Sequence, residues 1–188
     1  LFREVGNLRP VANTLSILGF FLLLDGNIES AQKCLDESNM LFQQLNPKAE
    51  KGHLLGTYGL IALMRGDYEQ ARAYFQENAT KNKELGSRMD YLWANVRLGH
   101  VALYEGNLTE AREVLSETAR NFHKDEHTIG LVFTLELMAS LYVAVGKPEN
   151  AAQLIGWADA TREKHDAPRL FLEQSVMDRD AAAVVARI

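Results

Sequence analysis

The chain has 188 residues, of which 47% are hydrophobic and 24% charged, and its formal net charge is -5. This length and apolar fraction suit one domain or a short repeat array, and the acidic balance argues against direct contact with nucleic acid. A single cysteine excludes an internal disulfide and is typical of a reducing cytoplasm. The sequence contains no run of 18 apolar residues, so we predict no membrane-spanning helix.

A joint with a 40-residue period organises the chain. It reads LLDGNIESAQKCL, then LMRGDYEQARAYF, LYEGNLTEAREVL and VAVGKPENAAQLI. Three columns of small residues share this register, which indicates an internal repeat. The columns are Gly26, Gly66, Gly106 and Gly146; Ala31, Ala71, Ala111 and Ala151; and Gly19, Gly59, Gly99 and Ala139.

Each joint has the residues that end one helix and begin the next. The joint glycine can adopt the left-handed conformation that terminates a helix, and Asn27, Asp67 or Asn107 then supplies an N-cap. The fourth joint places Pro148 at the first helical position instead. The apolar periodicity predicts an all-α chain with helices at about 9–24, 28–45, 49–64, 68–85, 88–104, 108–123, 128–145 and 148–165.

The repeat boundaries follow from this register. Residues 1–6 (LFREVG) align with 41–46 (LFQQLN), so we interpret them as the end of a truncated preceding repeat in a longer protein. Four repeats span 7–46, 47–86, 87–126 and 127–168. The segment 169–188 is predicted to be a C-terminal capping helix that covers the apolar face of the last repeat.

Leu18-Gly19 and Leu22, followed by alanine and an apolar residue such as Ala71 and Phe75, resemble the tetratricopeptide pattern. The usual period is about 34 residues, and the longer period here is attributed to a longer second helix and linker. HEAT-like arrays have similar periods but lack this glycine and alanine register. The resemblance implies a right-handed superhelix of antiparallel helix pairs that binds proteins or peptides.

A narrower resemblance rests on the repeat consensus and on residues 146–168, GKPENAAQLIGWADATREKHDAP. These are similar to the C-terminal sensor arrays of bacterial MalT-like and LuxR-type transcriptional regulators and related signalling ATPases. The resemblance implies a non-catalytic interaction or effector-sensing domain, cytoplasmic, with its ATPase and output domain elsewhere in the polypeptide. A plain assembly scaffold and a peptide-pheromone receptor array remain open as alternatives.

In tetratricopeptide arrays the first helix of each repeat lines the concave face, and the resemblance transfers this face by register. Trp93, Arg97, His100 and Tyr104 fall on one side of one helix, and such a line suits an extended peptide or an anionic small ligand. The competing interpretation is that Trp93 is core and Arg97 merely solvated. The predicted partner-binding residues are His53, Thr57, Trp93, Arg97, His100, Tyr104, Phe133 and Glu136.

One stretch imitates an enzyme motif. His123, Glu126 and His127 have the H-x-x-E-H spacing of a metallopeptidase, which needs both histidines on one helix to hold zinc. The register places Glu126 at a turn between repeats, so we interpret the stretch as a polar turn. No P-loop or nucleophile elbow is present either. We therefore expect no catalytic residues, no metal and no cofactor.

Overall fold

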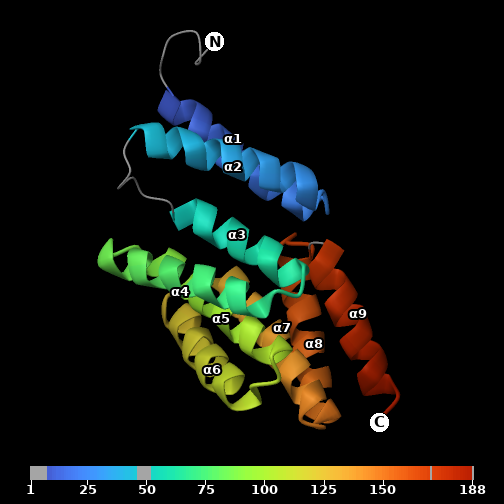
Figure 1. The fold of residues 1–188 in the computed structure, drawn as a ribbon. Helices are drawn as coiled ribbons and strands as arrows, with labels where there is room; N and C mark the ends of the chain where they lie inside the picture. Colours follow the sequence, from blue (N-terminus) through green and yellow to red (C-terminus); the bar gives the residue numbers. More distant parts are fainter. Residues whose placement is uncertain (1–7, 46–51, 170, 188) are drawn as a thin grey trace. The chain divides into compact units, whose positions relative to one another are not determined.

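The computed structural model describes residues 8–45, 52–169 and 171–187 (Figure 1). Within these ranges the chain forms nine α-helices and no strand, which confirms the all-α prediction. From residue 8 to 165 the predicted helix ends agree with the observed ones to within one residue wherever both flanks are described. The helices are α1 (Leu8–Leu24), α2 (Ile28–Leu45), α3 (Gly52–Met64), α4 (Tyr68–Glu84), α5 (Arg88–Tyr104), α6 (Leu108–Lys124), α7 (Thr128–Ala144), α8 (Pro148–Lys164) and α9 (Phe171–Val185).

A residue with positive φ ends each helix from α3 to α8, at 20-residue intervals. Gly66, with φ of 76°, shows the geometry: its N–H donates to Leu63 O, and the N–H of Asp67 donates to Ala62 O. These two bonds are the Schellman motif, which satisfies carbonyl groups that the helix leaves free. The series is Gly66, Gly86, Gly106, Glu126, Gly146 and Asp166. The joints between repeats therefore have the same geometry as the joints within them.

Side chains then cap the following helices. Asn27, Asp67 and Asn107 accept hydrogen bonds from the backbone N–H three residues ahead, at 3.2, 3.1 and 3.3 Å. These contacts confirm the three N-caps predicted from the sequence. His127 caps α7 in the same way, because its Nδ1 accepts from the N–H of Gly130 at 2.9 Å.

The glycine column lies where paired helices touch. A Cβ built on Gly59 would lie 2.6 Å from the ring of Phe75, and one on Gly99 would lie 2.6 Å from Leu115 Cδ2. Phe75 and Leu115 are themselves buried. The missing side chain thus admits a large residue of the second helix, which explains why this column contains only small residues.

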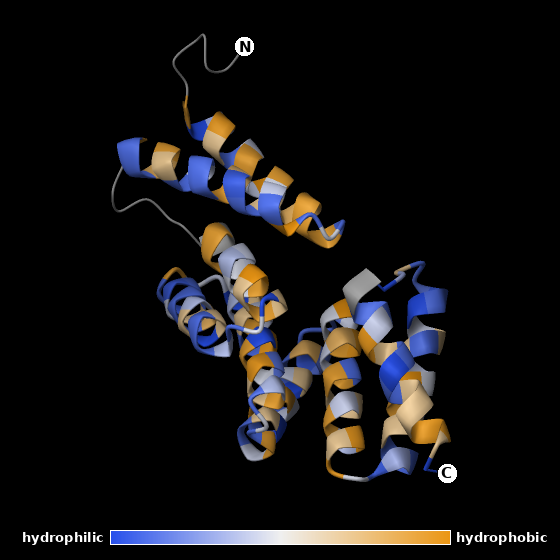
Figure 2. Cartoon of the chain, turned by 45° about the vertical axis from the view of Figure 1, so that its right-hand side comes forward, coloured by the Kyte–Doolittle hydropathy of each residue, from blue (hydrophilic) through white to orange (hydrophobic). Residues whose placement is uncertain are grey.

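The helices form two compact units, Leu1–Leu85 and Gly86–Ile188. In the first unit α3 packs against α1, α2 and α4, around a core that includes Leu23, Leu35 and Ile61. In the second unit α6 and α8 each pack against α7, and α9 packs against both α7 and α8. The helices differ in hydropathy, because α3 and α7 consist mostly of apolar residues, whereas α4 and α6 carry many hydrophilic ones (Figure 2).

The helix α1 carries an exposed apolar face. Ile17 and Phe21 are 58% and 57% exposed, and Leu18 and Phe20 are also exposed. At the repeat position of Phe21, Ile61 and Leu141 are 2% and 3% exposed, because residues of the preceding helix pair pack against them. The side of a first helix that is core in later repeats is therefore open on α1.

Candidate functional site

The predicted binding residues divide between the two units. In the first unit, Thr57 lies on α3 and is buried, which contradicts its predicted exposure to a partner. His53 belongs to the same helix, but its side chain lies outside the described residues. In the second unit, Trp93, Arg97, His100 and Tyr104 lie on α5, and Phe133 and Glu136 lie on α7.

Trp93 and Phe133 belong to the core rather than to a binding surface. The Trp93 ring centroid lies 5.6 Å from those of Phe122 and Phe133, and all three rings pack with the core residues Leu92 and Val96. Phe133 is 4% exposed, so its predicted groove position is wrong. The physical reason is that these rings fill the space between α5, α6 and α7, and the partly buried Trp93 packs against that core, as its core interpretation expected.

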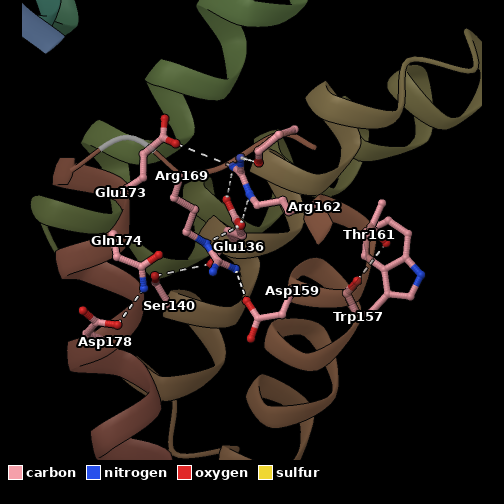
Figure 3. A network of polar contacts seen from close by, with 11 residues as sticks. Glu136, Ser140, Trp157, Asp159, Thr161, Arg162, Arg169, Glu173, Gln174 and Asp178 are labelled. Carbon is pink, nitrogen blue, oxygen red and sulfur yellow. Dashed lines mark hydrogen bonds and ion pairs between the residues drawn. The ribbon is translucent and has the colours of Figure 1, made fainter. Parts of the chain in front are cut away.

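Glu136 is also buried, at 3% exposure, so this structure does not present its side chain at the surface as the predicted binding role requires. Its carboxylate accepts two hydrogen bonds from Arg162, with Nε at 2.6 Å from Oε1 and Nη2 at 2.7 Å from Oε2 (Figure 3). Arg169 Nε donates to the same Oε1 at 2.8 Å. Two arginines of the same chain therefore donate to the Glu136 carboxylate, which the sequence analysis had assigned to partner binding.

These contacts connect α7, α8 and α9. Arg169 Nη2 forms an ion pair with Asp159 Oδ1 at 2.6 Å, and Arg162 Nη2 lies 3.6 Å from Glu173 Oε2 on α9 (Figure 3). Burial acts to lower the pKa of Arg162, but the hydrogen bonds and charge of Glu136 raise it above its usual value. The Arg162 guanidinium thus stays charged, and the network links helices within the second unit.

The repeat alignment of the sequence contains a signal for this network of buried charges. Arg162 occupies the repeat position of Phe42 and Phe122, which are both core residues. A cation at a core position requires a buried anionic partner, because an unpaired buried charge is costly. That requirement pointed to Glu136, the one charged residue of helix α7.

A second buried carboxylate lies on α9. Ser140 Oγ donates to Asp180, which is 1% exposed, and Arg179 Nη2 lies 2.7 Å from Asp180 Oδ1. His100, Ser140 and Asp180 occupy the same repeat position on α5, α7 and α9, at intervals of 40 residues. The polar contact thus uses equivalent positions of two neighbouring first-type helices.

Three of the predicted residues, Arg97, His100 and Tyr104, remain as a partly accessible cluster, named here the α5 polar face. Arg97 is half-buried with its Cζ 4.6 Å from the centroid of Phe133, and the His100 ring stacks on Tyr104 at 4.9 Å between centroids. Tyr104 is 39% exposed. The sequence therefore predicted this cluster correctly as one helix face.

The electrostatics of the α5 polar face are unusual for a surface. Burial lowers the pKa of Arg97, an effect that the charge of Glu173 opposes. Burial, followed by the positive charges of Arg97 and Arg179, lowers the pKa of His100 to about 3. Near neutral pH the face therefore presents one guanidinium cation beside an uncharged imidazole, a combination that can donate hydrogen bonds to an anion.

The H-x-x-E-H stretch is confirmed as a turn between repeats. His123 lies in the last turn of α6, Glu126 has φ of 53°, and His127 caps α7. The two histidines thus lie on opposite sides of the turn, one in α6 and the other at the N-cap position before α7. In the described parts of the chain, no group of three potential ligands among His, Cys, Asp and Glu is placed to hold a metal ion. No helix in those parts is long and apolar enough to cross a membrane.

Residues 10–77 match the family model described as tetratricopeptide repeat. The chain is similar to tetratricopeptide repeats. The match covers most of α1, all of α2 and α3, and more than half of α4. The pairwise packing of consecutive helices agrees with a tetratricopeptide-like solenoid. Repeats of this family generally bind proteins or peptides. A search of curated proteins found no match.

Proposed function

We propose that the chain is a non-catalytic protein-interaction domain and that its partner binds on the α5 polar face. The observation that carries this proposal is that Arg97, His100 and Tyr104 share one helix face without belonging to the aromatic core or to the Glu136 network. Arginine and tyrosine are enriched among the residues that dominate binding energy at protein interfaces. The match to tetratricopeptide repeats supports the same class of function.

The proposed context is a cytoplasmic sensor region of a bacterial signalling or transcriptional regulator. Residues 146–168 support it through their resemblance to MalT-like and LuxR-type arrays. Binding of a protein, a peptide or a small effector would then bias an ATPase or output domain in the same polypeptide. The complete reading frame tests this context, because a P-loop ATPase encoded upstream supports it and a reading frame without one contradicts it.

An assembly scaffold is the second candidate, and the apolar face of α1 favours it. A cluster that contains Ile17, Phe20 and Phe21 in exposed positions is typical of a surface that another protein element covers. A scaffold would use that face and would not depend on the α5 polar face, so the two functions differ in which substitutions impair them. A peptide-pheromone receptor would instead depend on the α5 polar face for a short peptide.

The decisive experiment compares binding of a partner recovered by affinity capture and then purified. The double variant Arg97→Ala with Tyr104→Ala should weaken the complex by about 1–3 kcal/mol, typical of truncated interface hot spots. Arg120→Ala on α6, which removes an exposed arginine, is the matched control and should bind normally. Circular dichroism and thermal melting establish that each variant is folded. Full affinity in the double variant would overturn the proposal.

A further inference from the structure

We infer that the α5 polar face binds a carboxylate of its partner, which Arg97 and the imidazole N–H of His100 hold together. This inference rests on the proposed function and specifies the chemistry of the contact. Arg97 and His100 are three residues apart on α5, so their side chains lie on the same face of the helix.

The first argument is the unpaired charge of Arg97. In the second unit, the packed arginines Arg162 and Arg169 each have a carboxylate partner, and so do the more exposed Arg88 and Arg179. Among the described residues, no hydrogen bond or ion pair involves the half-buried Arg97. Removing a cation from water without a counter-ion is unfavourable, and a bound anion would offset that loss.

The second argument is the orientation of that guanidinium. It lies over the Phe133 ring, which is itself fixed in the core. Stacking on an aromatic face restricts a guanidinium group while its N–H donors stay available at the edge. Carboxylate oxygens match the spacing of two such donors, and bidentate pairs of this type are among the strongest hydrogen bonds in proteins.

The third argument is the state of His100. Its Nδ1 is buried and has no hydrogen-bond partner within the described residues, whereas Nε2 is not among the buried unpaired atoms. A doubly protonated ring would leave a buried N–H at Nδ1 without an acceptor, so one proton on Nε2 is the favoured state. His100 then offers a neutral donor beside the Arg97 cation.

The charges around the face select the class of anion. The charge of Arg179 is matched by Asp180, and Glu173 is the nearby acidic group that acts on Arg97. Arg97 is therefore the one cation of the α5 polar face, and its guanidinium forms no ion pair within the described residues, which suits a monovalent carboxylate. A phosphate dianion would carry an excess negative charge toward Glu173 and toward a chain whose net charge is -5.

The test uses three N-acetylated peptides and the intact chain. The first, acetyl-AAEAA-amide, carries a glutamate carboxylate; the second, acetyl-AAQAA-amide, has none; and the third, acetyl-AAAAA with a free C-terminus, carries an α-carboxylate. Nuclear magnetic resonance follows the Arg97 side-chain Nε–H and the His100 ring signals during titration. Binding of either carboxylate peptide, with at least tenfold weaker binding of the glutamine peptide, supports the inference and identifies which carboxylate is preferred.

Variants make the result specific. Arg97→Met keeps an unbranched apolar stem over Phe133 but removes the charge, and it should weaken carboxylate binding at least tenfold, while Arg120→Met should not. Equal binding of all three peptides, no binding of any, or tighter binding of inorganic phosphate would overturn the inference. If the peptides fail but the purified partner still depends on Arg97 and Tyr104, the proposed function stands without it. If binding of the purified partner does not depend on Arg97 and Tyr104, both the proposed function and the carboxylate inference are contradicted.

Discussion

Arg162 contacts both oxygens of Glu136, at 2.6 and 2.7 Å, and both side chains are more than nine-tenths buried. The pair joins α8 to α7, and Arg169 brings the segment before α9 to the same carboxylate. Because the geometry is bidentate and Nη1 of Arg162 also donates to Ala167 O, the buried charges are well satisfied. One carboxylate thus links α7, α8 and the segment before α9.

Glu136→Gln should be strongly destabilising. The change leaves Arg162 and Arg169 buried without their common anion, and breaking a buried pair in this way costs about 3–5 kcal/mol. Urea denaturation measures the free energy of unfolding. The exposed pair Lys81 and Glu77, with atoms 2.6 Å apart, is the control, and Glu77→Gln should cost less than about 1 kcal/mol. Equal effects of the two substitutions would contradict the structural role of the network.

Gly99→Ala should destabilise the second unit although alanine favours helices. The added Cβ would lie 2.6 Å from Leu115 Cδ2 in a filled core, and overpacking of this kind costs about 1–3 kcal/mol. Gly156→Ala is the matched control, because that helical glycine is exposed and has no atom within 4 Å of its added Cβ. It should gain about 0.5–1 kcal/mol. Thermal and urea unfolding of both variants check the opposite signs.

The left-handed joints predict another pair of opposite effects. Gly66 has φ of 76°, so Gly66→Val should lower the free energy of unfolding by about 1–2 kcal/mol. Glu126 has φ of 53° without being glycine, so Glu126→Gly should raise it by roughly 0.5–1 kcal/mol. Urea denaturation measures both, and unchanged stability of Gly66→Val would contradict the capping argument.

His100 should make stability depend on pH. Its pKa is about 3 in the folded chain, below the ordinary value of 6.5, so between these pH values the unfolded chain binds more protons. The contribution of the His100 ring to the free energy of unfolding is therefore complete above pH 6.5. It is lost as the pH falls toward 3, by at most about 1.4 kcal/mol per pH unit. Arg97 and Arg179 are the charges that act on this ring.

His100→Gln isolates this contribution. The variant removes the titrating ring. As the pH falls from 7 to 4.5, the free energy of unfolding of the wild type should therefore fall relative to that of the variant. Urea denaturation at several pH values measures this difference. His123→Gln, at the exposed end of α6, controls for loss of a histidine. A difference that stays constant over this range would show that His100 does not titrate in this way.

Much of the fold was predictable from the sequence because its signals are local. A left-handed glycine, an N-cap and an apolar stripe each act within a few residues, and Gly66 with Asp67 shows the first two at one joint. The register identified Gly59 as a member of a small-residue column, and the structure adds that Phe75 fills the space beside it. The helix positions were predicted for this reason.

The candidate site was only partly predictable because burial depends on distant partners. Glu136 and Phe133 have the repeat positions of groove residues, but Arg162 on α8 and Trp93 on α5 bury them. Helical spacing identified the line of Arg97, His100 and Tyr104, since these lie on one helix. It could not show that Arg97 would stack on Phe133, a contact between residues 36 positions apart. Partner binding by these residues stays a prediction.

The even spacing of the joints bears on how such an array changes in length during evolution. Because Gly66, Gly86 and Gly106 have the same left-handed geometry, a duplication or deletion of 40 residues joins one equivalent turn to another and keeps each glycine opposite its large partner. A change of 20 residues would preserve the turns but exchange the roles of first and second helices. Tandem copying of whole pairs is thus the tolerated genetic event, and individual surface positions such as Arg97 can then diverge without disturbing the joints.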